Sequence, residues 1–109
     1  MQTSQTTAEF ESYDEFIKAY DTAVASNEKF IVYLVAAIVQ CDENGVCKSW
    51  CPDCDEARPF ITKLLEKNSS RKVIQGTVMT KEEWVRVSTH PYKVHPQIKA
   101  GGVPGLILF

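Results

Sequence analysis

The sequence predicts one domain of the α/β class, in which a sheet carries helices on its faces. The chain has 109 residues, 44% of them apolar, which is enough for one compact core and too few for two. Its apolar run FIVYLVAAIV at 30–39 is typical of a strand that is covered on both faces. Strand-like and helix-like segments alternate after this run, and such an order implies a right-handed crossover between strands.

The first elements follow from local patterns. Residues 1–9 are polar, so we expect them to form a flexible amino terminus that precedes a single domain at 10–109. Apolar residues at helical spacing predict a helix at 13–26. Ser12, with Glu15 three residues later, predicts that a capping box begins this helix.

The remaining elements alternate between strand and helix. After the strand at 30–39, residues 40–50 are expected to form a loop that contains the turn signal Asn44-Gly45. The next helix is predicted at 52–68, with an inward-facing stripe of Phe60, Ile61, Leu64 and Leu65. Three segments complete the domain: a strand at 72–79, a helical stretch at 81–98 that Pro91 and Pro96 interrupt, and a strand at 105–109.

Charge and hydropathy exclude several classes of partner. The 12 basic and 14 acidic residues give a net charge of −2 and form no basic stripe that could pair with phosphates, so nucleic acid is not an expected partner. The amino-terminal segment MQTSQTTAEFES lacks the basic and apolar regions of a signal peptide. The apolar run at 30–39 is about half the length of a bilayer span. We therefore expect a cytoplasmic protein without a membrane partner.

The cysteines are clustered, since Cys41, Cys47, Cys51 and Cys54 all lie within fourteen residues. In a chain without an export signal, clustering favours redox catalysis or metal binding over permanent stapling. Pro52 suits the first position of a helix, which places Cys51 at the N-cap. Unpaired backbone N–H groups and the macrodipole stabilise a thiolate there, so Cys51 is the predicted nucleophile. Cys54, one turn further on, is the predicted resolving thiol.

The acidic residues around this motif act in two directions. Asp53, Asp55 and Glu56 complement the dipole at the start of the helix. They also place negative charge near the Cys51 thiolate, which opposes its ionisation. The same acids disfavour a glutathione-driven enzyme, an alternative with the same cysteine spacing, because glutathione is anionic.

Other roles for the four cysteines stay open at this point. A non-catalytic module could use Cys51 and Cys54 to sense redox state, and all four cysteines could form a zinc cage. We expect no bound metal, because structural zinc sites usually draw their ligand pairs from separate segments.

The type of loop decides whether Cys41 and Cys47 can pair. A two-residue turn at Asn44-Gly45 would place the two cysteines on opposite faces of a hairpin. A three-residue loop with Gly45 in the left-handed conformation would place them directly across from each other, and a disulfide would be feasible.

Several of these residues together resemble the thioredoxin fold. The resemblance covers about residues 10–109 and rests on Trp50-Cys51-Pro52-Asp53-Cys54, Pro59 and the Val103-Pro104 step before the last strand. The segment KSWCPDC is similar to the subgroup of 14-kDa thioredoxin-related proteins, also called thioredoxin domain-containing protein 17. The resemblance implies a thioredoxin-like three-layer sandwich.

The resemblance also implies an activity and roles for the site residues. It implies a disulfide reductase without a bound cofactor, which receives electrons from NADPH through thioredoxin reductase and acts on protein disulfides and small disulfides such as cystine. Cys51 becomes the nucleophile and Cys54 the resolving cysteine. The supporting residues are Trp50 as a platform, Pro52 and Asp53 as the intervening pair, and Pro104 as a cis-proline that leaves the backbone of Val103 to pair with a substrate.

Two of the departures of the chain from the pattern of the family concern the motif and the sheet. The strand predicted at 30–39 contains no carboxylate, whereas thioredoxins carry a buried aspartate there, so no acid on this strand can accept the proton of Cys54. A full thioredoxin fold also continues into one more strand and a closing helix, whereas this chain stops at Phe109. We therefore expect a fold truncated after the strand that follows the cis-proline, whose free edge pairs in a homodimer.

Overall fold

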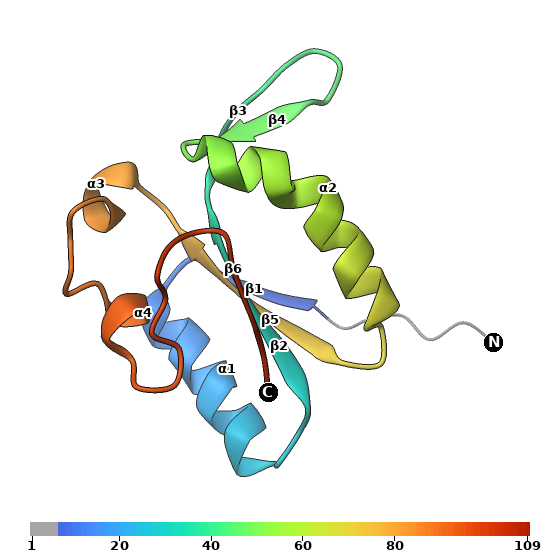
Figure 1. Ribbon diagram of the computed structural model, residues 1–109, viewed down its shortest axis with the longest axis vertical. Coiled ribbons are helices and arrows are strands. Elements are labelled where there is room, and N and C mark those ends of the chain that lie inside the picture. The colour runs from blue at the N-terminus through green and yellow to red at the C-terminus, as the bar shows by residue number, and fades with distance from the viewer. Residues whose placement is uncertain (1–6) are drawn as a thin grey trace.

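The computed structural model describes residues 7–109 and places a four-stranded sheet between two layers of helix (Figure 1). The strands of this sheet, in their spatial order, are β1 (Thr7–Phe10), β5 (Lys72–Val78), β2 (Phe30–Ala36) and β6 (Gly105–Leu108). β1 and β2 run parallel to β5, and β6 runs antiparallel to β2. The predicted α/β class and the three-layer arrangement are confirmed.

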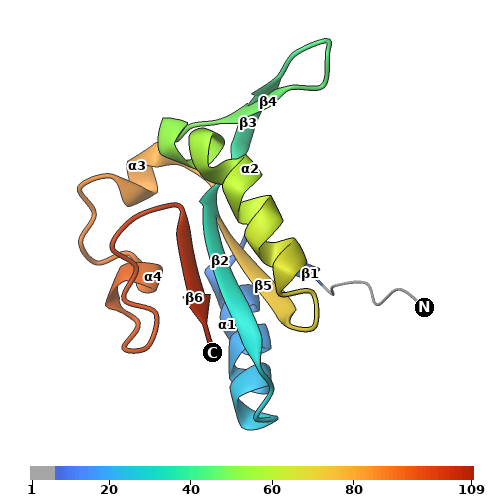
Figure 2. The ribbon, with the colours of Figure 1, turned by 45° about the vertical axis from the view of Figure 1, so that its right-hand side comes forward.

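The helices are divided between the two faces of the sheet. α1 (Tyr13–Ala25) and the short helices α3 (Lys81–Trp84) and α4 (Pro91–Val94) lie on one face, and α2 (Pro52–Lys67) lies on the other (Figure 2). Every residue of β2 is buried. Its side chains alternate between two cores. The first core contains Phe30, Val32 and Leu34, and the second contains Ile31, Tyr33 and Val35.

The predicted flexible amino terminus is wrong for residues 7–9. Residues 1–6 of that segment lie outside the described residues, and β1 begins at Thr7. β1 pairs in parallel with β5, from Thr7 opposite Val73 to Phe10 opposite Gly76. Phe10 also packs against the core on the α1 face. Pairing with β5 satisfies the backbone groups of this segment, so strand formation overrides its polar composition.

The structure also divides residues 30–50 differently from the predicted strand at 30–39 and loop at 40–50. β2 ends at Ala36, and a separate hairpin follows, formed by β3 (Ile38–Cys41) and β4 (Cys47–Ser49). All four residues of β3 are exposed, and the hairpin extends away from the main sheet (Figure 1). The apolar side chains of Ile38 and Val39 therefore continue the hydrophobic run without continuing the buried strand.

Two details of the helices differ from prediction, whereas the continuation of α2 past Pro59 agrees with it. Ser12 is the N-cap of α1 but makes no side-chain capping hydrogen bond within the described residues, whereas Thr80 and Glu83 form a complete capping box before α3. α2 continues through Pro59 to Lys67. Pro91 begins α4 and does not interrupt a longer helix, because the first helical position requires no backbone N–H.

The stripe predicted for α2 is correct in only half of its members. Ile61 and Leu65 pack against the core under α2. Phe60 and Leu64 are 71% and 41% exposed. Within the part of the chain that the structure describes, no helix is both long enough and apolar enough to span a bilayer.

Candidate active site

The start of α2 places the two cysteines of the motif at different depths. Cys51 is the N-cap residue, with extended backbone and a partly exposed side chain, and Pro52 occupies the first turn. Cys54 is fully buried in the core between α2 and β2. Both cysteines are free, and Cys51 is one of the neighbours that raise the pKa of Cys54. The structure therefore contains a dithiol with one accessible sulfur and one shielded sulfur.

The environment of Cys54 holds its proton firmly. Burial raises the pKa of this thiol to about 12. This value includes an opposing contribution from the backbone of Ala36, which lowers the pKa, and smaller contributions from Cys51 and Asp55, which raise it. Cys54 is therefore a thiol, and not a thiolate, near neutral pH.

A set of hydrogen bonds fixes the backbone at Cys51. The hydroxyl of Ser49 accepts a hydrogen bond from the backbone N–H of Cys51 at 3.0 Å and donates to the Cys51 carbonyl at 2.9 Å. The N–H of Ser49 in turn donates to Oδ1 of Asp55 at 2.8 Å, and Nη2 of Arg58 donates to the same oxygen at 3.1 Å. These contacts tie β4 to the first turns of α2 and hold the N-cap residue in place.

Asp55 is ionised more readily than an ordinary aspartate. Burial acts to raise its pKa, but the hydrogen bonds from Ser49 and the hydrogen bond and charge of Arg58 outweigh it, so the pKa lies below the usual 3.8. The carboxylate therefore keeps its hydrogen bonds from Ser49 and Arg58 over the whole neutral range.

The other predicted site residues surround Cys51. Nε1 of Trp50 donates to the carbonyl of Val78 at the end of β5, at 2.9 Å. The Val103-Pro104 peptide bond is cis, as the resemblance implies, and the thiol of Cys51 lies 3.7 Å from the Val103 carbonyl. The chain segments around 50 and 103, far apart in sequence, thus meet at the accessible sulfur. Asp53 stands on the first turn of α2 with an exposed side chain.

Two residues of this arrangement were not predicted from the sequence. Ser49 lies two positions before Cys51, where a hydroxyl can bond to the backbone of the turn. Arg58 follows Asp55 at the i,i+3 spacing that allows a helical ion pair. Both signals are local and could have been found by inspecting the flanks of the motif.

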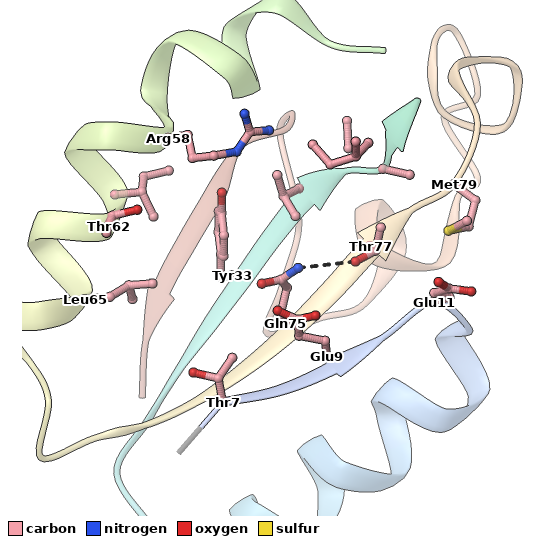
Figure 3. Close-up of a pocket in the computed structure, with 15 residues that line it drawn as sticks. Thr7, Glu9, Glu11, Tyr33, Arg58, Thr62, Leu65, Gln75, Thr77 and Met79 are labelled. Atoms are coloured by element: carbon pink, nitrogen blue, oxygen red, sulfur yellow. Dashed lines mark hydrogen bonds between the residues drawn. The ribbon is translucent and has the colours of Figure 1, made fainter. Parts of the chain in front are cut away.

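The strand beneath Cys54 carries a phenol, Tyr33, in the core that contains Cys54. Burial raises the pKa of Tyr33; the negative charge of Cys54 adds to the effect, and the charge of Arg58 opposes it. Figure 3 shows the hydroxyl of Tyr33 pointing toward Arg58, at the side of an open hollow of about 530 Å³ between α2 and strands β1 and β5. Polar residues such as Glu9, Gln75 and Thr77 line this hollow, and neither Cys51 nor Cys54 does. It is therefore a feature separate from the dithiol.

The second pair of cysteines forms a disulfide in the β3–β4 hairpin. Asp42 and Val46 pair through their backbones, which leaves a three-residue loop at 43–45, and Gly45 has a φ of 80°. Cys41 therefore lies across from Cys47, with a Cα–Cα distance of 4.0 Å, and the two are bonded. The second of the two predicted loop types is the one observed. A four-thiolate zinc cage is not formed, because these two sulfurs are bonded to each other.

Comparison with known proteins decides the family of this fold. Residues 6–109 match the thioredoxin domain of the thioredoxin domain-containing protein 17-like family. The chain belongs to this family. It is also similar to the thioredoxin-like protein Clot of Arabidopsis thaliana, with 39% identity over 61 residues. The corresponding protein Clot of Oryza sativa subsp. japonica is 29% identical over 108 residues.

The extent of these matches differs. The match with the Arabidopsis protein covers 55% of this chain and 45% of that protein, less than half of its length. The match with the rice protein covers 94% of this chain and 73% of that protein. The family assignment therefore applies to the domain as a whole, including the dithiol and the cis-proline.

The difference in depth between the two cysteines predicts selective alkylation. We expect iodoacetamide to modify Cys51 in the native reduced protein and to leave Cys54 unmodified. The thiolate is the reacting form, and a thiol with a pKa of about 12 is ionised in about one molecule in ten thousand near pH 8. Peptide mass spectrometry measures the two modifications, and denatured protein serves as the control in which both cysteines react. Equal labelling in the native protein would contradict the burial of Cys54.

The lowered pKa of Asp55 predicts a stability difference that depends on pH. Because its folded-state pKa lies below 3.8, the carboxylate stabilises the fold fully above that value and loses this effect as the pH falls through the folded-state pKa. Asp55→Asn should therefore lower the free energy of unfolding by roughly 1 kcal/mol at neutral pH. Urea unfolding at neutral and strongly acidic pH measures the difference, which should shrink on acidification. A difference that stays constant would show that the charge is not involved.

Proposed function

We propose that this chain is a thiol-disulfide oxidoreductase, a protein-disulfide reductase of the thioredoxin type, which acts through Cys51 and Cys54. The observation that carries the proposal is the pairing of a partly exposed N-cap Cys51 with a buried, protonated Cys54 one helical turn further on. Membership of a thioredoxin-domain family supports this use of the pair. The residues proposed to support the dithiol are Trp50, Pro52, Asp53, Val103 and Pro104.

The reaction proceeds through two exchanges. The Cys51 thiolate attacks one sulfur of the substrate disulfide, forms a mixed disulfide and releases the other substrate sulfur as a thiolate. Cys54 then loses its proton and attacks the Cys51 sulfur, which releases the reduced substrate and closes the Cys51–Cys54 bond. Formation of the mixed disulfide removes the charge of Cys51, one of the causes that raise the pKa of Cys54. The second cysteine is thus activated only after the first has reacted.

The proposed substrates are protein disulfides and small-molecule disulfides. The carbonyl of Val103 stands beside the Cys51 sulfur, where an extended substrate segment could pair with the backbone. We propose that NADPH supplies the electrons through thioredoxin reductase, in the cytoplasm and without a bound cofactor. The acids at positions 53, 55 and 56 support this source over anionic glutathione.

Replacing the resolving cysteine tests the proposal. With Cys54→Ser, mixed disulfides between Cys51 and substrate should accumulate, because the second exchange is removed. Non-reducing electrophoresis and mass spectrometry of the adducts measure this, and the double variant Cys51→Ser/Cys54→Ser is the matched control without a nucleophile. The unchanged chain should oxidise NADPH when thioredoxin reductase and cystine are supplied together.

Two experimental outcomes would favour a function other than the proposed one. The absence of adducts with Cys54→Ser would indicate a non-catalytic module that uses the pair to sense redox state. Reduction of the dithiol by glutathione alone, at the rate that thioredoxin reductase achieves, would indicate a glutathione-driven enzyme.

We also propose that β6 joins two copies of this chain in a homodimer. Within residues 7–109, β6 is at the edge of the sheet and pairs with β2 on one side, and Leu108 is 52% exposed. Unpaired strand edges are templates for pairing with another chain. Light scattering should show dimer formation as the concentration rises, and a stable monomer over a wide concentration range would overturn this proposal.

A further inference from the structure

The Cys41–Cys47 disulfide is a second redox-capable group that the proposed reaction does not use. It closes the β3–β4 hairpin immediately before the Cys51 motif. We propose that this disulfide is a second redox centre, opened by an external dithiol, and that its state controls the reactivity of Cys51. This inference concerns the reactivity of one thiol and does not depend on which disulfides the protein reduces.

The disulfide is accessible to a reductant. Cys41 is exposed and Cys47 is partly exposed, and the hairpin extends away from the main sheet (Figures 1 and 2). In this conformation the Cys51 sulfur of the same chain lies against the Val103 carbonyl, 3.7 Å away. The reductant is therefore a separate molecule that carries a dithiol.

Opening of the Cys41–Cys47 bond takes two thiol–disulfide exchanges. A thiolate of the external dithiol attacks the exposed sulfur of Cys41, which breaks the Cys41–Cys47 bond and releases Cys47 as a thiolate. The second thiol of the reductant then attacks the mixed disulfide and releases Cys41. The reductant becomes a disulfide, the hairpin gains two electrons, and the two protons of the dithiol pass to the two released sulfurs. A small-molecule disulfide reverses the reaction.

A continuous set of contacts connects the hairpin to Cys51. Nη1 of Arg58 donates to the carbonyl of Cys47 at 3.5 Å. The same guanidinium pairs with Asp55, which accepts the N–H of Ser49, and the Ser49 hydroxyl bonds to both backbone groups of Cys51. Cys47 and Ser49 are the two ends of the three-residue strand β4. A shift of β4 is therefore transmitted to Cys51 by two routes, through the strand itself and through Arg58.

The disulfide is the covalent restraint on this hairpin. The pairing of β3 with β4 is irregular between Ile38 and Gln40, and a two-stranded hairpin is marginally stable in water. Asp42 supports the turn through its side chain, which accepts from the N–H groups of Asn44 and Val46. Opening the bond leaves this turn as the main support, so the Cys47 carbonyl and Ser49 lose their fixed places. The start of α2 then holds Cys51 less firmly, and its reaction slows.

The experiment uses the full chain with Cys54→Ser, in which Cys51 has no partner within the motif. Titration with dithiothreitol, followed by maleimide labelling and mass spectrometry, should raise the count from one reactive thiol to three while the circular dichroism of the fold is kept. Cys51 alkylation by iodoacetamide is then timed with the hairpin closed and with it opened. We expect alkylation to be slower by at least about threefold when the hairpin is open.

Three variants in the same background test the path from the hairpin to Cys51. Arg58→Ala should slow Cys51 alkylation in the closed state, and opening the hairpin in that variant should have a smaller effect than in the parent, because the two changes share a route. Gly45→Ala is the matched control: it strains only the turn, where φ is 80° and an added Cβ meets nothing within 4 Å, and should leave the rate unchanged. The variant Cys41→Ser/Cys47→Ser should match the opened hairpin.

The inference is overturned if the bond opens only when the fold is lost, or if Cys51 reacts equally fast in the closed and open states. Fully additive effects of Arg58→Ala and of opening would remove Arg58 from the path. These readouts involve neither NADPH nor a substrate. A chain without reductase activity would therefore disprove the proposed function and leave this inference standing, and unchanged alkylation in an active reductase would do the reverse.

Discussion

The burial of β2 on both faces is the constraint on which the rest of the structure depends. A strand with apolar side chains on both parities must be covered by two layers, and each fully buried aliphatic side chain contributes about 1.5–3 kcal/mol. α1 covers one face and α2 the other. Because α2 lies against Tyr33 and Val35, the first turn of this helix directs one residue into the core, and that residue is Cys54. The chemistry of the motif is thus set by the packing of the sheet.

The second determinant is the hydrogen bonding before α2. Helix starts leave backbone N–H groups without partners, and the side chain of Cys51 does not cap them. Ser49 and Asp55 stabilise this junction from either side of the cysteine, one from β4 and the other from the helix. The Cys51 sulfur is therefore left available for chemistry, since the backbone around it is held by other residues. This division of roles explains why a hairpin outside the main sheet matters for the motif.

The elements with strong hydrophobic periodicity were predictable from the sequence. The features that depend on pairing with another segment, or on which face of a helix is buried, were not. β2, α2 and the dithiol follow from an apolar run, a proline at a helix start and the cysteine spacing. β1 depends on β5 for its pairing, and its own sequence is polar. The buried face of α2 runs through Cys54, Ile61 and Leu65; counting apolar residues alone added Phe60 and Leu64, which lie outside that face. The pairing of Cys41 with Cys47 depended on the conformation of Gly45, which sequence leaves open.

The absence of a carboxylate on β2 gives the second exchange of the proposed reaction a particular character. Burial is the largest cause of the raised pKa of Cys54, and burial persists after Cys51 has formed a mixed disulfide. The backbone hydrogen bond at Ala36 favours the Cys54 thiolate, while Tyr33 offers a phenol whose own pKa is raised. Loss of the Cys51 charge therefore removes only part of what raises the pKa of Cys54. In the proposed reaction a substrate would therefore have to stay bound at the Cys51 sulfur through a slower second step, and the carbonyl of Val103 is the backbone group that lies beside that sulfur.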